Sequence, residues 1–336
     1  MRIAIVTLPL LNNYGGVLQN YALQIVLKKM GFCVETLDFE CKTISWWRYL
    51  RSWIKSFFFI FIPGKKCSFA RILKKEKRSI FFEDFVSNNI KKTASLNPLK
   101  VQFFCKGKYD CYVVGSDQIW RPKYSPSVKV SFLSFIKKEH VKRIAYAASF
   151  GVNNWEYTPS QTRMSSSLIK KFDAISVREE SGVKLCKDYL NVNASLVLDP
   201  TLLLQKEDYL KLCESVLPST NRYLMAYVLN PDDSIRSTFK QIAAEEKLDL
   251  KVFFADSRAA LSIPEWLAMF RDAAYVVTDS FHGTIFSIIF EKRFRCVYNK
   301  VRGTARFESL LNLYNSGKLD EMRRFSLNWL KNALES

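Results

Sequence analysis

The feature that most constrains the fold is an alternation of short apolar runs with helical stretches along most of the chain. The run Ile3–Leu8 is typical of a strand, residues 12–16 of a turn, and Val17–Met30 of a helix that ends at Gly31. A second strand is expected at Phe32–Phe39. Two strands joined by a helix of this length form a right-handed βαβ unit, so the pattern predicts a parallel sheet.

The alternation occurs in two series, as a length of 336 residues and a usual domain size of roughly 100 to 200 residues would suggest. Buried strands of the first series are expected at 112–115, 144–148, 174–177 and 196–198. Those of the second are expected at 223–229, 251–255, 275–278 and 294–298. We therefore expect an α/β protein of two Rossmann-like parallel-sheet domains, 1–205 and 206–336, facing each other across a cleft. Ligands should bind where the carboxyl ends of the two sheets meet.

Positive charge is concentrated in one segment that interrupts the first series. The chain has 51 Lys and Arg against 32 Asp and Glu, a formal net charge of +19. Residues 42–108 hold 16 of the basic and three of the acidic residues, and we interpret them as a helical, aromatic-rich insertion in the first domain. Such a segment can meet nucleic acid, a membrane surface or a phosphorylated ligand. Nucleic acid is not expected as a partner, because the insertion carries no recognised nucleic-acid-binding motif.

The cysteines and the apolar runs of the chain indicate whether a metal site, a reducing environment or a membrane span is to be expected. The eight cysteines form no CxxC pair and only His140 and His282 accompany them, so we expect no metal and a reducing cytoplasmic setting. The apolar start of the chain leads into a glycine-bearing turn, which favours a first strand over a signal peptide. No run reaches the ~20 apolar residues that span a bilayer, so contact with the inner face of the membrane would be peripheral.

Two polar segments follow strands of the first domain, at the edge where a ligand is expected. Residues 12–16 contain two glycines before a helix, where free backbone amides favour an anionic or polar ligand; a tight turn is the alternative. Residues 115–120 carry small and polar side chains that could bind sugar hydroxyls or cap a helix. The candidate ligand-binding residues of the two segments are Asn13, Tyr14, Gly15, Gly16, Ser116, Asp117 and Gln118.

Two charged side chains follow strands elsewhere. Arg178 comes after the strand at 174–177, where a guanidinium can bind a carboxylate or phosphate bidentately or form a surface salt bridge. His282 comes after the strand at 275–278, where an imidazole that titrates near neutrality can transfer a proton. A packed or capping histidine is the alternative there. His140 lies in a charged turn and is expected to be exposed and inert.

These segments taken together resemble the polysaccharide pyruvyl transferase family. The resemblance spans about residues 3–313, nearly the whole chain. It is carried by Asn-Tyr-Gly-Gly at 13–16, Gly-Ser-Asp-Gln-Ile-Trp at 115–120, Ser-Val-Arg-Glu at 176–179, Asp199-Pro200, Asp-Ser-Phe-His-Gly at 279–283 and Arg306-Phe307. It implies a GT-B-like pair of domains and transfer of a pyruvyl group from phosphoenolpyruvate to a saccharide as a cyclic ketal, with phosphate released and no cofactor.

The resemblance also implies a role for each candidate residue. His282 is similar in position to the family's proton donor, and Arg178 to its ligand for the carboxylate or phosphate of the donor. Some members have an arginine two places before the histidine, where this chain has Ser280, so we nominate Arg302 or Arg306 as the second anion ligand. The acceptor is expected to bind the seven candidates of the first domain. The expected donor-binding residues are Ser280, Gly283, Thr284, Arg302 and Arg306.

Further expectations concern the membrane and a rival activity. Aromatic and basic residues mix at 46–62, which favours contact with a membrane and a lipid-linked acceptor; a hairpin that covers the first domain is the alternative.

The rival activity is a glycosyltransferase of the same fold with a nucleotide-sugar donor, His282 as the base and residues 300–306 on the diphosphate. For pyruvyl transfer, Arg178→Ala and His282→Ala are expected to remain folded and to lose turnover. The sequence assigns neither the acceptor sugar nor an oligomeric state.

Overall fold

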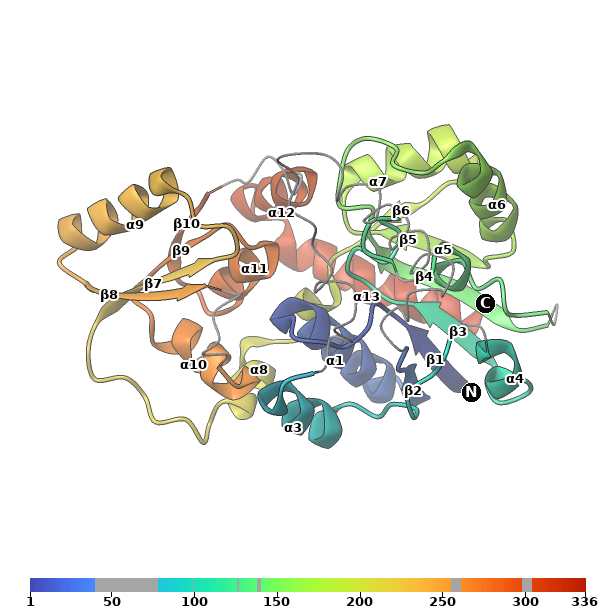
Figure 1. Cartoon of the computed structure of the whole chain (residues 1–336), viewed down its shortest axis with the longest axis horizontal. Coiled ribbons are helices and arrows are strands. Elements are labelled where there is room, and N and C mark those ends of the chain that lie inside the picture. The colour runs from blue at the N-terminus through green and yellow to red at the C-terminus, as the bar shows by residue number, and fades with distance from the viewer. Residues whose placement is uncertain (40–77, 99, 126, 138–139, 255–260, 298–303) are drawn as a thin grey trace, which may run out of the picture.

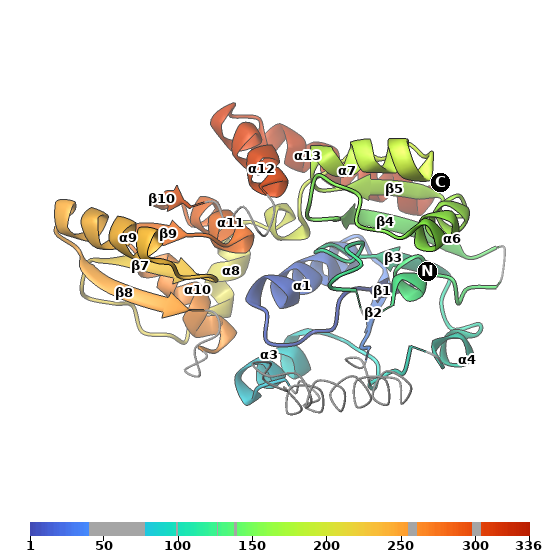
Figure 2. The same cartoon turned by 45° about the horizontal axis from the view of Figure 1, so that its top comes forward.

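A computed structural model describes residues 1–39, 78–98, 100–125, 127–137, 140–254, 261–297 and 304–336. It contains two parallel β-sheets with helices packed on their faces (Figure 1). The expected fold class, α/β with two Rossmann-like parallel-sheet domains, is confirmed. The domains meet at a seam where the helices α1 (Tyr14–Lys29) and α11 (Phe281–Ile289) contact each other (Figure 2).

The first sheet has six strands in the order β2-β1-β3-β4-β5-β6. Ile3 pairs with Val34 on one side and with Cys111 on the other, so β1 is a central strand. Because the chain adds β2 on one side of β1 and β3 on the other, the carboxyl ends of β1 and β3 form a switch point where ligands bind. The strands are β1 (Arg2–Val6), β2 (Cys33–Leu37), β3 (Cys111–Val114), β4 (Lys142–Ala148), β5 (Ala174–Val177) and β6 (Ser195–Leu196).

The second sheet repeats this arrangement with four strands in the order β10-β9-β7-β8. Its switch point lies between β7 and β9, and α11 begins shortly after β9. The strands lie within a few residues of their expected positions, because each is a short apolar run bounded by polar or turn residues. They are β7 (Tyr223–Val228), β8 (Asp249–Phe254), β9 (Tyr275–Thr278) and β10 (Arg293–Cys296).

The C-terminal helix α13 (Leu319–Glu335) returns to the first domain, although the sequence grouped it with the second. Its Ser326 Oγ accepts a hydrogen bond of 2.9 Å from the amide of Leu198, and the carbonyl of Leu334 accepts one of 2.9 Å from Lys142 Nζ. The chain therefore ties the two domains together twice. The other helices are α3 (Ile80–Asn89), α4 (Val101–Cys105), α5 (Val128–Ser131), α6 (Pro159–Ile169), α7 (Glu180–Leu185), α8 (Lys206–Leu212), α9 (Asp233–Glu245), α10 (Ile263–Asp272) and α12 (Ala305–Asn315), with single turns at η2 (Cys186–Leu190) and η3 (Pro200–Leu203).

Aromatic side chains fill the seam between the domains. Tyr14, in the first turn of α1, stacks on Trp266 of α10 with ring centroids 4.9 Å apart, and its hydroxyl donates a 2.6 Å hydrogen bond to the carbonyl of Leu261. Tyr227 and Phe253 pack edge-on against the same tyrosine. Burial raises the pKa of Tyr14 above its ordinary value, so its hydroxyl stays protonated. This apolar contact fixes the start of α1 against the second domain.

The basic insertion is described only in part. Residues 78–98 and most of 100–108 contain α3 and α4, so the expectation of helices holds for this portion. The segment 46–62, for which membrane contact was expected, lies outside the described residues. Among the helices that are described, none combines the length and the apolar character needed to cross a bilayer.

Candidate functional site

A cavity of about 290 Å³ lies at the seam, where the carboxyl ends of the two sheets meet. The first domain contributes residues 12–15 after β1 and residues 117–118 after β3. The second contributes residues 279–282 after β9, together with Arg306 and Phe307 of α12 and Tyr227 and Leu229 near the end of β7. The structure therefore brings together segments that the sequence predicted to meet, at the switch points of both sheets.

His282 sits in the first turn of α11 and is 8% exposed. The helix begins with Ser280 as its N-cap, whose hydroxyl accepts a 3.2 Å hydrogen bond from the amide of Gly283. The ring of His282 packs directly on Gly15 of the first domain, because a Cβ atom at Gly15 would lie only 2.0 Å from Nδ1. Glycine is thus required at position 15 for the close approach of the two domains.

The other ring nitrogen of His282 faces a buried carboxylate. Nε2 is 3.7 Å from Oδ2 of Asp199 and has no hydrogen-bond partner among the described residues. Burial alone would raise the pKa of Asp199, but the neighbouring His282 and Arg178 lower it well below its ordinary value. An ionised Asp199 therefore stands beside the buried Nε2 of the imidazole, which has no hydrogen-bond partner among the described residues.

Arg178 lies behind the cavity with both of its terminal nitrogens bonded to the protein, while its Nε is buried without a hydrogen-bond partner among the described residues, 3.9 Å from Oε2 of Glu179. Its Nη1 donates to Oδ2 of Asp199 at 2.5 Å and to the hydroxyl of Ser116 at 3.1 Å, and its Nη2 donates to Oδ1 of Asp117 at 3.1 Å. The side chain is 1% exposed. Burial would lower its pKa, but Asp199, Asp117 and Glu179 raise it above the ordinary value. The alternative to ligand binding was a surface salt bridge, and the structure shows a buried one instead.

Arg306 differs from Arg178 in facing the cavity and in forming no ion pair with a carboxylate of the described residues, although the charges of Glu179 and Asp117 act on it from nearby. It is 5% exposed, and its Nε is buried with no hydrogen-bond partner in the part of the chain that is described. Burial and the nearby charge of Arg178 lower the pKa of Arg306 to about 10. An unmatched guanidinium beside the N-terminus of α11 forms a site suited to an anion.

The remaining donor-side candidates mostly shape α11. The hydroxyl of Thr284 donates to the carbonyl of Ser280 at 3.1 Å, and Gly283 is needed because a Cβ there would lie 2.4 Å from Oγ1 of Thr278. Gly283 and Thr284 therefore lie behind the cavity wall, whereas Ser280 lines it. Arg302 lies outside the described residues.

Some of the candidate acceptor-binding residues line the cavity, and others lie behind its wall. Asn13 caps α1 by accepting a 3.1 Å hydrogen bond from the amide of Gly16, and Gln118 accepts one of 3.1 Å from Arg121. Gly16 and Ser116 do not line the cavity, and Ser116 is fully buried in the network of Arg178. The candidates that do line it are Asn13, Tyr14, Gly15, Asp117 and Gln118.

Sequence reasoning gave no role to two residues of the site. Asp199 follows β6 just as Arg178 follows β5, and this position at the carboxyl edge of the sheet was the signal that could have found it. Phe281 was not singled out, yet the guanidinium carbons of Arg178 and Arg306 lie 4.8 and 5.2 Å from its ring centroid. No sequence pattern indicates a ring shared by two cations, because the arginines come from different domains.

Comparisons with known proteins match the chain to one family and to several solved structures. The family model described as "Polysaccharide pyruvyl transferase" matches residues 13–301. No curated protein matches the chain. Solved structures that are similar to it include UDP-GlcNAc 2-epimerase from Neisseria meningitidis (10% identity, 99% of each chain covered, TM-score 0.49) and UDP-GlcNAc 2-epimerase from Methanocaldococcus jannaschii (11%, 88% of this chain and 83% of the other, 0.45). A glycosyltransferase from Rickettsia africae is also similar (12%, 99% and 93%, 0.40).

Proposed function

The chain belongs to the polysaccharide pyruvyl transferase family, and we propose that it moves a pyruvyl group from phosphoenolpyruvate to a hexose of a cell-surface polysaccharide or of its lipid-linked precursor. The product would be a cyclic ketal, with phosphate released and no cofactor required. The observation that carries the proposal is the pair formed by His282 and the unmatched Arg306 on the wall of one small cavity.

The donor would bind on the side of the second domain. Phosphoenolpyruvate carries a carboxylate and a phosphate, and Arg306 with the N-terminus of α11 offers positive charge and free donors to one of them. The cavity of about 290 Å³ is at the small end of the roughly 300–1,000 Å³ typical of ligand pockets. That size favours a three-carbon donor over the nucleotide sugar of the rival glycosyltransferase.

His282 would act as the proton donor. Protonation of the methylene carbon C3 makes C2 electrophilic, and one sugar hydroxyl adds to C2 and loses its proton. The C2–O bond to phosphate then breaks, phosphate leaves, and a second hydroxyl adds to C2 with loss of its proton to close the ketal. The anionic leaving group would be stabilised by Arg306 where its charge develops.

The proposed acid stands in a cluster of buried charged side chains. Asp199 would orient the ring, and Arg178 would act through Asp199 and Asp117 as a positioning residue rather than on the donor. The charged side chains of this cluster are Asp117, Glu179, Asp199, Arg178 and Arg306.

Donor binding is tested by thermal denaturation with phosphoenolpyruvate and with a nucleoside diphosphate. We expect phosphoenolpyruvate to raise the melting temperature, because it binds the folded state only, and the nucleoside diphosphate to leave it unchanged. Arg306→Met should weaken this binding roughly tenfold to a hundredfold, as hydrogen bonds to charged groups are worth about 1.5–3 kcal/mol. Arg293→Met removes an exposed guanidinium of the same domain and serves as the control. Stabilisation by the nucleoside diphosphate alone would favour the glycosyltransferase.

Turnover is tested with phosphoenolpyruvate and a panel of galactosyl, glucosyl and mannosyl acceptors, followed by mass spectrometry for the gain of one pyruvate ketal. His282→Ala should abolish the gain while His140→Ala, which changes an exposed histidine far from the cavity, should not. Near-parental turnover of His282→Ala would refute its role as the acid.

A further inference from the structure

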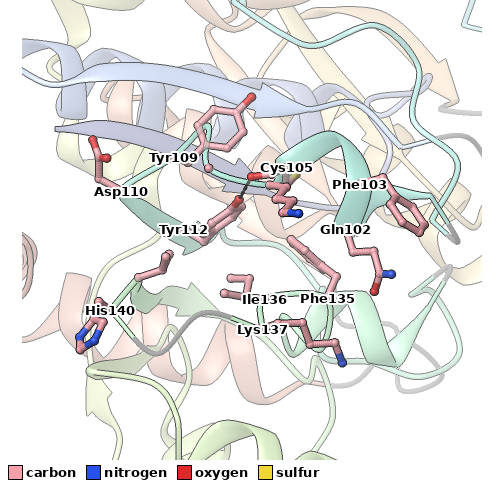
Figure 3. A pocket seen from close by; sticks show the side chains of 13 residues that line it. Gln102, Phe103, Cys105, Tyr109, Asp110, Tyr112, Phe135, Ile136, Lys137 and His140 are labelled. Atoms are coloured by element: carbon pink, nitrogen blue, oxygen red, sulfur yellow. Dashed lines mark hydrogen bonds between the residues drawn. The ribbon is translucent and has the colours of Figure 1, made fainter.

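A second, larger cavity opens at the opposite edge of the first sheet. It is a groove of about 870 Å³. One wall is formed by α4 and the segment that follows it, and the other by residues 135–137. Tyr109 and Val141 lie just before β3 and β4, so the groove borders the amino ends of the strands, whereas the cavity of His282 lies at their carboxyl ends. Figure 3 shows Phe135 and Ile136 on one wall. The pyruvyl transfer proposed above makes no use of this groove.

The interior of the groove is apolar. Cys105, Tyr112 and Phe135 are buried in it, at most 8% exposed. The tyrosine hydroxyls are already used, because Tyr112 donates to the carbonyl of Cys105 at 3.2 Å (Figure 3) and Tyr109 donates to Oε2 of Glu35 at 2.5 Å. The groove can therefore take up a hydrocarbon chain without leaving these hydroxyls unpaired.

The rim of the groove is cationic and carries one projecting aromatic ring. Phe103 is 73% exposed, and the lysines Lys106 and Lys137 beside it are exposed as well. The carboxylate of Asp110 is matched by Arg2, whose backbone nitrogen donates to it at 2.7 Å, so it does not cancel the lysines. Two further lysines, Lys100 and Lys108, are exposed on the same stretch of chain.

We propose that this groove binds an anionic phospholipid of a membrane surface, with an acyl chain in the groove and the headgroup phosphate against Lys106 and Lys137. An exposed aromatic residue flanked by lysines matches the interfacial zone of a bilayer, where the ring enters the headgroup region and the lysines meet negative charge. The charge on the rim selects this occupant over a neutral apolar partner. The role of this groove does not depend on the proposed catalysis.

Vesicle flotation tests the proposal, with the full chain and phosphatidylcholine vesicles that contain or lack phosphatidylglycerol. The parental chain should float with the anionic vesicles and be released by high salt, which screens charges at the surface. The variant Phe103→Ser, Lys106→Glu, Lys137→Glu should bind at least tenfold more weakly, since one lysine near an anionic surface changes binding about fivefold. Its turnover of a water-soluble acceptor should equal that of the parent, which separates this test from that of the proposed function.

A matched control changes the same residue types on other surfaces. Leu217, Lys187 and Lys240 are all exposed, and Leu217→Ser with Lys187→Glu and Lys240→Glu gives the same net charge. This control should bind within about twofold of the parent. Equal binding by the groove variant and the control, or no binding of the parental chain to anionic vesicles, would overturn the proposal. If the triple variant fails to fold, the single variants Lys106→Glu and Lys137→Glu, which change exposed side chains, are compared with Lys187→Glu and Lys240→Glu in the same assay.

Discussion

The two sides of the seam each bury an arginine, and the two arginines lie near the same ring, that of Phe281, in opposite electrostatic situations. On the first domain's side, Arg178 is bonded to Asp117 and Asp199, and these neighbours raise its pKa. On the second domain's side, burial and the nearby Arg178 lower the pKa of Arg306 to about 10, against the opposing charges of Glu179 and Asp117. The Nε atoms of both arginines are buried without a hydrogen-bond partner among the described residues, so the contrast lies in the ion pairs of the terminal nitrogens. Residue type and burial are alike, and only the partners differ.

This difference indicates that Arg178 stabilises the structure of the site, whereas Arg306 is available to bind a ligand. A buried guanidinium surrounded by carboxylates has no capacity left for a further anion, and its removal would leave those carboxylates uncompensated. A buried guanidinium without a carboxylate is unfavourable until an anion arrives, so the protein carries a cost that the ligand relieves. The first domain therefore supplies a rigid charged frame, and the second supplies the cation and the imidazole that would meet the donor.

The largest effect that tests this comparison is on stability. Arg178→Met should lower the free energy of unfolding by about 3–5 kcal/mol, the usual cost of removing one partner of a buried ion pair. Arg306→Met should change it by less than about 1 kcal/mol or raise it, because a poorly compensated buried charge is removed. Urea denaturation followed by tryptophan fluorescence measures both.

If the two substitutions lower the free energy of unfolding equally, then Arg178 and Arg306 do not differ in their electrostatic situation. Arg121 provides a further reference, since it forms a partly buried pair with Glu156 at 2.9 Å within the first domain. This prediction replaces the expectation from sequence that Arg178 can be removed without affecting folding. That expectation treated Arg178 as a ligand-binding side chain, and its 1% exposure makes it part of the core.

The fold could be predicted from the sequence because local pattern determines it. Each strand is a short apolar run bounded by polar or turn residues, and β9 has the limits that the sequence indicated. The return of α13 to the first domain could not be predicted, because the amphipathic pattern of a helix does not say which sheet it covers. Tertiary contacts such as Lys142 with Leu334 decide that choice.

The site was predictable in position but not in its division of roles. The rule that ligands bind at the carboxyl ends of parallel strands placed His282, Asp117 and Gly15 near one another, and the structure brings them to one cavity. Whether an arginine after a strand meets a ligand or a carboxylate depends on side chains from distant segments. Asp199 lies 21 residues beyond Arg178, and no spacing rule connects them.

A second, smaller effect concerns the response of the charged frame to acid. The pKa values of Asp117 and Asp199 are lowered in the folded protein, so their contribution to stability is fully present above the ordinary aspartate value of about 3.9 and is lost as the pH falls below it. Asp199→Asn should reduce the slope of the unfolding free energy against pH by up to about 1.4 kcal/mol per pH unit in that range. Urea titrations at a series of pH values measure the slope.

Asp279→Asn is the matched control for this titration, because Asp279 also lines the cavity and accepts hydrogen bonds from the backbone amides of Leu229 and Asn230 at 2.6 and 2.9 Å, whereas Asp199 accepts one from Arg178. An unchanged slope in Asp199→Asn would mean that Asp199 is not held ionised by Arg178. The frame of the first domain would then be no more acid-sensitive than the rest of the chain.

The smallest effect on stability, and the most direct test of contact between the two sides, is expected from Gly15→Ala. A Cβ atom there would lie 2.0 Å from Nδ1 of His282, so the ring must move, while alanine within α1 gains about 0.5–1 kcal/mol over glycine. We expect the free energy of unfolding to fall by roughly 0.5–2 kcal/mol, the usual cost of overpacking less the gain from alanine. Turnover should fall at least tenfold, since misplaced catalytic groups are costly. Gly16→Ala, whose Cβ would meet only the flexible side chain of Asn13 at 3.1 Å, should keep turnover within about threefold. If Gly15→Ala turns over as fast as Gly16→Ala, then the close packing of His282 on the first domain is not needed for the reaction, and the frame and the ligand-binding side work independently.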